Sequence, residues 1–245
     1  DGFQHPPAFI GVEPLPPDSP SACWWAAQFP PIHCVQLPDR SRTCNMLPTM
    51  TGREYRERDE AAALTECRRR VLAHWHFLQT HFPEFRHYRQ TWIAPRLGVR
   101  EGLRVVCERM LTESDIRLGV GRKVEPDIIA LADHAMDRHG EGGGCLELEE
   151  PYGIPYRCLI PRGWRNLLCA SKSAGFSSIV ASSVRLSRTV MQLGQAAGTA
   201  VALAHRQGSD VAAVPPAALR EALRGRHAQV DWPMPPELGA YLEDE

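Results

Sequence analysis

Residues 182–204, SSVRLSRTVMQLGQAAGTAVALA, constrain the fold more than any other stretch of the sequence. Apolar residues recur there at helical spacing, and Gly and Ala fill most of the second half. The two interior glycines, Gly194 and Gly198, each cost a helix roughly 1 kcal/mol relative to alanine. We therefore expect a helix over 188–205 in which small residues serve a close contact.

A short apolar segment and a loop of small residues precede this helix, over 166–170 and 171–183. The order strand, loop, Gly/Ala helix is typical of a Rossmann-type fold, in which the helix lies close to a parallel sheet or a bound nucleotide. The start of such a helix offers free N–H groups and the positive end of its dipole to an anion. Close packing between two core helices explains the same pattern, and spacing alone leaves both interpretations open.

Composition places the chain among ordinary soluble globular proteins, with one large domain or two small ones in 245 residues. A net charge of −1 and a pI of about 6.9 indicate neither a nucleic-acid partner nor a membrane-surface partner. The most apolar run, 190–204, is too short to cross a bilayer. The first residues lack the pattern of a signal peptide, so we expect none.

The eight cysteines are scattered without a Cys-x-x-Cys motif, which argues against a disulfide scaffold and against zinc or iron–sulfur ligation. We expect most of them to be small buried hydrophobic residues, and a reducing, cytoplasmic compartment is slightly favoured. His74 and His76 are two residues apart and fall on different sides of a helix. With His81 and His87 they predict no metal site.

The coarse pattern along the chain gives several further elements. Prolines crowd the first ~50 residues and predict extended or loop structure. Apolar residues at helical spacing predict a helix over 59–82, with its apolar stripe on Leu64, Cys67, Val71, Trp75, Leu78 and Phe82. We also predict a strand, a turn at Gly98 and a further strand or short helix over 89–116, a capping signal at 112–115, strands over 152–160 and 167–170, and a helix over 215–223.

Several ordered blocks resemble one known family. They are GVRE at 98–101, LTESD at 111–115, IPYRCLIP at 154–161, NLLCA at 166–170, SVR at 183–185 and GQAAGTA at 194–200. Together they resemble the family of FAD-dependent oxidoreductases, which includes xanthan-lyase-like flavoproteins. The resemblance extends from about residue 40 to about residue 225.

The resemblance implies an α/β protein: part of an FAD/NAD(P)-binding Rossmann-like domain of the glutathione-reductase type, with an antiparallel α+β substrate or cap region. Residues 1–95 would form the cap region, 96–225 the C-terminal part of the FAD domain with its closing strand at 166–170 and helix at 188–205, and 226–245 a tail. The family's Gly-x-Gly-x-x-Gly loop does not occur in this sequence. We therefore expect the chain to be a C-terminal portion whose partner is the N-terminal dinucleotide-binding segment of the same protein.

The resemblance also implies a set of site residues. Arg185 would hold a substrate carboxylate or offset negative charge on the flavin, with a surface ion pair as the alternative. Asp137 and His139 would transfer protons, with a solvated loop histidine as the alternative. The expected contacts with FAD are Arg100, Ala170, Ser171, Lys172, Ser183, Arg185, Gly194, Gln195 and Ala197.

Two departures and two ambiguous features accompany these assignments. Where the family has an arginine and then Thr-His-Glu, this chain has Lys172 and then Ser-Ser-Ile over 177–179, which argues against proton transfer by that loop. Arg100 and Glu101 form either a pair that orders a loop over the flavin or a purely structural pair. Trp24 and Trp25 line either a sugar-binding surface or a core or interface.

Three functions follow from the sequence. The first is a flavoenzyme, of which this chain is the C-terminal part, that transfers a hydride between FAD and a small or sugar-like substrate. The second is a cofactor-free binding module on the same scaffold. The third is a polysaccharide lyase-like protein, for which the sequence offers candidate residues without a specific arrangement.

Overall fold

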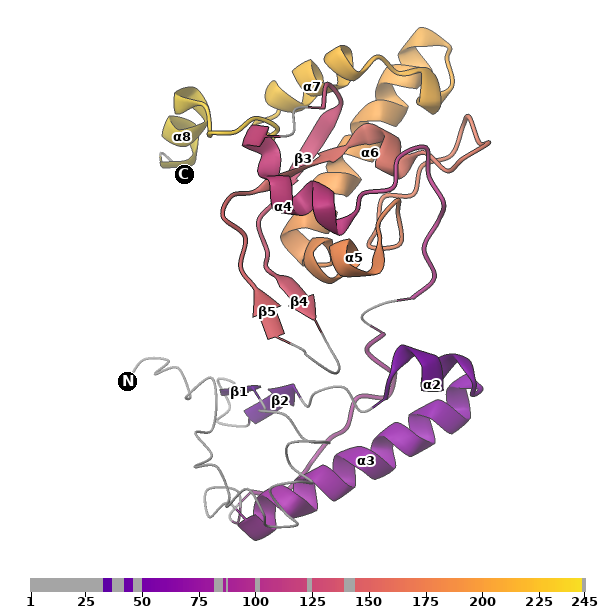
Figure 1. Ribbon diagram of the computed structural model, residues 1–245, viewed down its shortest axis with the longest axis vertical. Helices are drawn as coiled ribbons and strands as arrows, with labels where there is room; N and C mark the ends of the chain where they lie inside the picture. Colours follow the sequence, from indigo (N-terminus) through magenta and orange to yellow (C-terminus); the bar gives the residue numbers. More distant parts are fainter. Residues whose placement is uncertain are drawn as a thin grey trace. The chain divides into compact units, whose positions relative to one another are not determined.

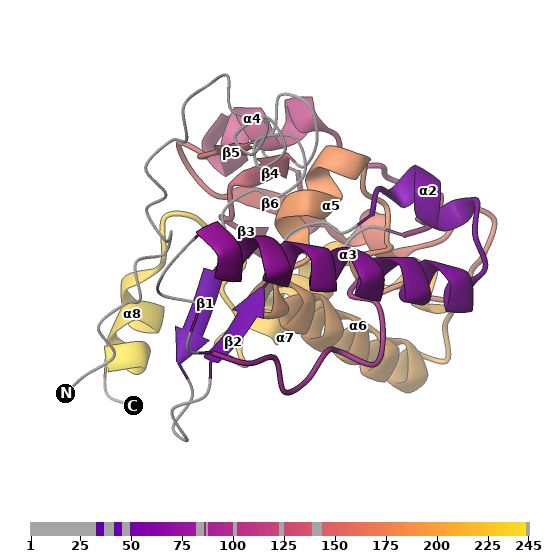
Figure 2. The same cartoon turned by 90° about the horizontal axis from the view of Figure 1, so that it is seen from below.

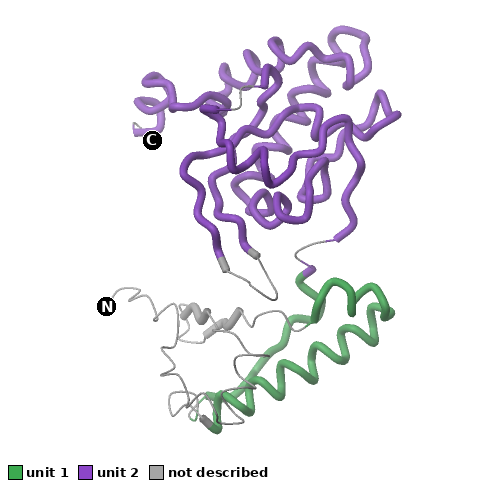
Figure 3. Tube along the Cα trace, in the orientation of Figure 1, with its two compact units in different colours: residues 1–98 green, residues 99–245 purple. Residues whose placement is uncertain are grey.

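In this computed structural model, the described residues are 33–36, 42–45, 50–81, 86, 88–99, 102–122, 125–138 and 144–243. The chain divides into two units, residues 1–98 and 99–245 (Figure 3).

The first unit contains one long helix and a small hairpin. Its elements are strands β1 (His33–Gln36) and β2 (Arg42–Asn45), which pair antiparallel, and helices α2 (Gly52–Arg56) and α3 (Glu60–His81). A capping box between Thr51 and Glu54 starts α2, since the Glu54 amide donates to Thr51 Oγ1 and the Thr51 amide donates to Glu54 Oε2. Helix α3 confirms the helix expected over 59–82.

The buried face of α3 differs in part from the expected stripe. Its buried residues are Ala63, Cys67, His74, Phe77 and Leu78. Leu64, Val71 and Trp75 are only half-buried. The buried face of α3 instead includes His74, a residue that the spacing of apolar side chains does not assign to a core. His76, two residues on, is exposed.

Acid is expected to weaken the first unit through His74. Burial lowers the pKa of its imidazole from 6.5 to about 4, because burial penalises the charged form. The unfolded chain therefore takes up a proton below about pH 6.5 that the folded chain refuses until about pH 4. Stability should fall across that window by up to about 1.4 kcal/mol per pH unit. Urea unfolding followed by helical circular dichroism measures the slope, and His74→Leu should flatten it; an equal slope in both proteins would contradict this assignment.

The second unit is built on a two-stranded antiparallel sheet. Strands β3 (Ile128–Ala132) and β6 (Tyr152–Pro155) pair in a register that sets Ala132 opposite Tyr152. Strands β4 (Met136–Arg138) and β5 (Gly144–Leu146) form a second antiparallel pair. The remaining elements are α4 (Glu113–Arg122), the 3-10 turns η2 (Tyr156–Leu159) and η3 (Val211–Ala213), α5 (Ser178–Val184), α6 (Ser187–Gln207), α7 (Pro216–Arg224) and α8 (Pro236–Glu243).

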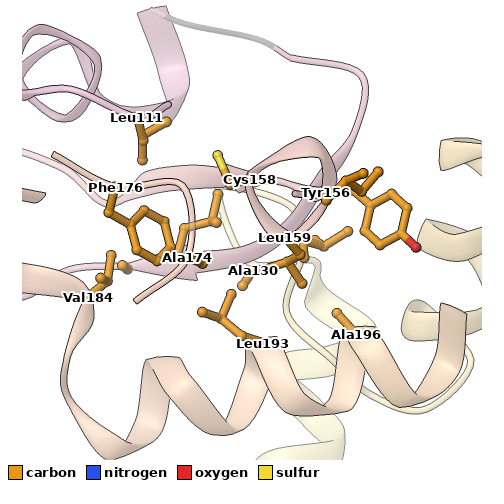
Figure 4. Close-up of a cluster of buried hydrophobic side chains, with 14 of the residues drawn as sticks. Leu111, Ala130, Tyr156, Cys158, Leu159, Ala174, Phe176, Val184, Leu193 and Ala196 are labelled. Atoms are coloured by element: carbon orange, nitrogen blue, oxygen red, sulfur yellow. The ribbon is translucent and has the colours of Figure 1, made fainter. Parts of the chain in front are cut away.

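Helix α6 packs against β3, and α7 runs beside both of them (Figures 1 and 2). Figure 4 shows the buried cluster between these elements, with Leu193 and Ala196 of α6 directed toward Ala130 and Leu159. Phe176, which is fully buried, fills the space beside them. The core thus joins segments that are far apart in the sequence.

Two predicted helices and one capping signal are confirmed. Helix α6 covers the expected 188–205 and ends at Gly208, whose φ of 62° is the left-handed conformation that glycine adopts without strain. Helix α7 covers most of 215–223 and ends at Gly225. The Thr112 amide donates to Asp115 Oδ2 at 2.7 Å, where α4 begins.

Three expected strands are wrong in whole or in part. The described residues of 89–116 form no strand, and only Cys107 and Leu111 make isolated bridges, to Pro161 and to Phe176. The strand over 152–160 ends at Pro155, because proline has no N–H to extend the ladder. The next amide, of Tyr156, donates to Asp127 O at 2.7 Å and turns the chain into η2.

The closing strand at 166–170 is also wrong. A strand needs an extended neighbour, whereas the segment beside it is the 3-10 turn η2, and Cys169 N donates to Leu159 O at 2.8 Å. Within the residues described, every sheet is a two-stranded antiparallel one. The parallel sheet that a Rossmann-type arrangement calls for is therefore not among these elements. No helix in the described part of the chain is both long enough and apolar enough to span a membrane.

Candidate functional site

The small-residue helix presents two different faces. Leu193, Ala196 and Ala200 are fully buried on the side that packs against the core. Gly194 and Gly198 are exposed on the other side, and a Cβ built at either would meet no atom within 4 Å. The alanines, not the glycines, thus allow the helix to approach β3.

We call the exposed side the α6 outer face, and its residues are Met191, Gly194, Gln195, Gly198 and Val201. Met191 and Val201 are 72% and 52% exposed. Ala197 lies half-buried at its edge. Gly194 and Gly198 each lower the stability of the helix, and neither relieves a close contact among the described residues. Packing of the core therefore does not explain these two glycines.

Arg185 and Asp137 come together next to the start of α6. Arg185 ends α5, and its Nη2 donates to Asp137 Oδ2 in an ion pair whose side chains are each 16% exposed. Arg185 Nε donates to Ser182 O at 3.1 Å, and the Asp137 amide donates to Ser182 Oγ at 3.1 Å. Two predicted site residues 48 positions apart are thus in direct contact.

Cys145 joins this pair, and the sequence contained no signal for it. The β4–β5 register sets Cys145 opposite Asp137, and its Sγ lies 3.7 Å from Asp137 Oδ1. The residue is exposed, while Cys67, Cys107 and Cys158 are buried as expected. Partial burial and the Asp137 carboxylate raise the pKa of the Cys145 thiol, so it stays protonated and is a weak nucleophile near neutral pH.

Ser183 lies in the core rather than on the surface. It is fully buried, and its hydroxyl donates to the carbonyl oxygen of His134 while accepting from Tyr152 Oη at 2.8 Å. Burial raises the pKa of the Tyr152 phenol, which therefore remains a donor. This chain of hydrogen bonds fastens α5 to β6.

Residues 170–172 form a half-buried loop with internal partners. The Ser173 amide donates to Ser171 Oγ at 3.1 Å, and Lys172 Nζ donates to the carbonyl oxygen of Val99. Ala170 packs against the core cluster. The positive charge of Lys172 therefore lies against a backbone dipole.

Several predicted residues lie outside the described residues, so the structure does not test them. They are Trp24, Trp25, His87, Arg100, Glu101 and His139, together with the side chain of His81. In the part of the chain that is described, no three His, Cys, Asp or Glu residues gather as a metal site would require.

The start of α6 has no side-chain cap, and two ion pairs lie beside it. Leu186 caps the helix without a side-chain hydrogen bond, so the first turn keeps N–H groups for an external acceptor. Arg185, which pairs with Asp137, lies immediately before it, and Arg188 in the first turn pairs with Asp133. An uncapped helix end, a cation and an open glycine face therefore occur along one helix.

Comparison with known proteins identifies the family. Residues 16–223 match the family model described as FAD dependent oxidoreductase. Neither the curated proteins nor the solved structures gave a match. The match spans most of the 245 residues, and the family implies an FAD-binding fold. The chain belongs to the family of FAD-dependent oxidoreductases.

Proposed function

We propose that this chain closes the flavin site of an oxidoreductase that transfers a hydride between FAD and a small or sugar-like substrate. The observation that carries the proposal is the α6 outer face, where Gly194 and Gly198 leave the helix backbone open. A flat ring, or the segment that holds it, can approach such a backbone more closely than one covered by larger side chains. The family supplies the cofactor, and this face supplies a surface for it.

The residues at the start of α6 fit the negative charge of FAD. Free N–H groups of the first turn would donate to the cofactor, and the Arg185 guanidinium would offset its charge. Asp137 would orient that guanidinium through the ion pair. Bound FAD would supply the hydride chemistry, and the chain would orient the ring and the substrate.

The other predicted site residues would contact the cofactor, transfer protons or hold Arg185 in position. Gln195, Ala197 and the 170–172 loop would contact the cofactor, and Arg100 would order a loop over it. Asp137 and His139 would move protons to and from the substrate. Ser183, being buried, would act by holding α5 and hence Arg185 in position.

The loop that binds the cofactor's pyrophosphate would come from elsewhere in the same protein. These 245 residues contain no Gly-x-Gly-x-x-Gly motif. We propose that a dinucleotide-binding segment of the same protein supplies it and that the α6 outer face lies against the assembled site.

A cofactor-free binding module on the same scaffold is the second candidate. Arg185 and Lys172, the two predicted cations of the site, already have partners within the chain. Arg185 pairs with Asp137 and Lys172 donates to the Val99 carbonyl, which favours this second candidate. In that function neither cation would be exchanged for a ligand.

The visible absorption of bound flavin separates the two candidates. The protein is purified in its natural full-length form and as the 245-residue chain, mixed with FAD and passed through gel filtration. The enzyme predicts a yellow full-length protein, and the module predicts a colourless one. A yellow 245-residue chain would mean that the site needs no Gly-x-Gly-x-x-Gly loop.

Gly194→Leu is expected to weaken FAD binding and to strengthen the helix. A leucine on the α6 outer face would obstruct the cofactor and lower its affinity by about tenfold or more. The same leucine should stabilise α6 by roughly 0.5–1 kcal/mol, because nothing lies within 4 Å of the new Cβ. Flavin titration and thermal melting measure the two effects. Ala217→Leu at an exposed position of α7 is the matched control, and unchanged affinity in Gly194→Leu would remove α6 from the site.

A further inference from the structure

A concave site lies on the 99–245 unit, and it shares no residue with the α6 outer face or the Arg185–Asp137 pair. Its volume is about 390 Å³, within the range of roughly 300–1,000 Å³ that is usual for small-molecule sites. Its lining residues are Glu108, Arg157, Ile160, Gly163, Trp164, Arg165 and Ala212.

Backbone hydrogen bonds hold the walls of this cavity rigidly. The turn at its rim is closed by the Trp164 amide on Pro161 O at 3.0 Å, with Gly163 at a φ of 81°. The Glu108 amide donates to Ile160 O at 2.9 Å. The Ala212 amide donates to Arg165 O at 3.0 Å. A preformed site of this kind loses little conformational freedom when a ligand binds.

Trp164 is the feature that points to a ligand. Its backbone lies in a hydrogen-bonded turn, and the residue is 62% exposed. A large indole surface left in water at the mouth of a cavity is typical of a binding platform, because aromatic faces gain most when a flat or ring-shaped partner covers them.

The charges around the platform favour an uncharged ligand. Arg165 pairs with Asp210 at 2.8 Å, and Arg157 pairs with Asp127 at 2.9 Å and with Glu125 at 2.8 Å. Each cation is therefore already offset by a carboxylate. Glu108 adds a further negative charge to the lining, so a phosphate or carboxylate ligand would be repelled.

Guanidinium donors and a carboxylate acceptor beside an aromatic face suit a ring that carries hydroxyl groups, since a hydroxyl both donates and accepts. We propose that this cavity binds a neutral sugar ring, which stacks on Trp164 while its hydroxyls bond Arg165 and Glu108. The proposal does not depend on the flavin site, because the two share no side chain.

Calorimetric titration of the 245-residue chain with methyl glucoside and with methyl glucuronide tests the assignment. The neutral glucoside should bind saturably, and the glucuronide should bind at least about fivefold more weakly, because Glu108 repels its carboxylate. Equal or tighter binding of the glucuronide would overturn the neutral-ligand assignment, and no saturable binding of either sugar would overturn the site.

Variants with matched controls locate the site. Trp164→Ala should weaken glucoside binding by about tenfold or more, and Arg165→Gln by a smaller factor. Trp92→Ala is the control, because Trp92 is also highly exposed, at 70%, and lies outside this cavity. Equal affinity in Trp164→Ala and wild type would overturn the proposal, whereas loss in Trp164→Ala alone supports it. All of these changes are at exposed side chains, and thermal melting verifies that each variant is folded.

Discussion

Gly175→Ala is expected to destabilise the 99–245 unit by about 3 kcal/mol. A Cβ at this position would lie 2.2 Å from the carbonyl oxygen of Arg109 and 2.9 Å from Cys107 Cβ. The first of these atoms belongs to backbone, so no side-chain rotation relieves the contact.

Hydrogen bonds on both sides prevent the segment from moving away. The Gly175 amide donates to Cys158 O at 2.8 Å, and the Leu111 amide donates to Gly175 O at 2.8 Å. Any shift that makes room for a methyl group therefore costs one of these bonds. Urea unfolding followed by circular dichroism measures the loss. Gly102→Ala, with open space around its Cβ, should unfold near the wild-type midpoint; a wild-type midpoint in Gly175→Ala would show that the backbone yields.

Arg157→Met is expected to cost about 3 kcal/mol, because it leaves a buried carboxylate without its cation. The Asp127 side chain is only 2% exposed and accepts from Arg157 Nε at 2.9 Å and from the Arg157 amide at 3.2 Å. The methionine keeps the aliphatic part of the side chain, so most of the loss is electrostatic.

A double-mutant cycle distinguishes the charge from the packing. Asp127→Asn removes the buried charge, so adding Arg157→Met to it should cost much less than Arg157→Met costs alone. The free energy of unfolding of all four proteins, from urea titrations, gives the coupling. Additive losses would mean that the pair does not stabilise the fold.

The helices of this protein could be predicted because their signals are local. The spacing of apolar residues in α3 and α6 and the glycines that end α6 and α7 lie within each helix. Helix α5 differs from the expected loop over 171–183, since only seven residues follow its N-cap, Ser177, and no periodicity develops over that length. Its small residues are as typical of a loop as of a short helix.

The strands could not be predicted as well, because a strand depends on a neighbour that is distant in sequence. Residues 166–170 are apolar enough for a strand, but the segment beside them turns at η2. There the Tyr156 amide donates to the backbone oxygen of Asp127, and the Arg157 amide donates to the Asp127 carboxylate. Nothing in the local pattern at 166–170 records the position of Asp127. Local apolarity alone therefore does not predict that a segment pairs as a strand.

In the candidate site, too, the sequence indicates some of the residues but not the contacts between them. The family resemblance indicated both Asp137 and Arg185, whereas their direct ion pair follows from the end of α5 meeting β4. Cys145 reaches Asp137 only through the β4–β5 register, and register is not evident from a three-residue strand. Residue types could be anticipated, and their mutual contacts required the fold.

The hydroxyl groups of Tyr152 and Ser183 have a consequence for native-state hydrogen exchange. Buried hydrogen bonds of these hydroxyls link β6, α5 and the segment around His134. Local unfolding of any one of these three segments therefore breaks hydrogen bonds of the others. Their amides should therefore exchange in one cooperative step of high free energy. Helix α8 has no buried residue and stacks Tyr241 on His227, so its amides should exchange earlier and separately. The segment that carries Arg185 would then belong to the slowest-opening part of the molecule.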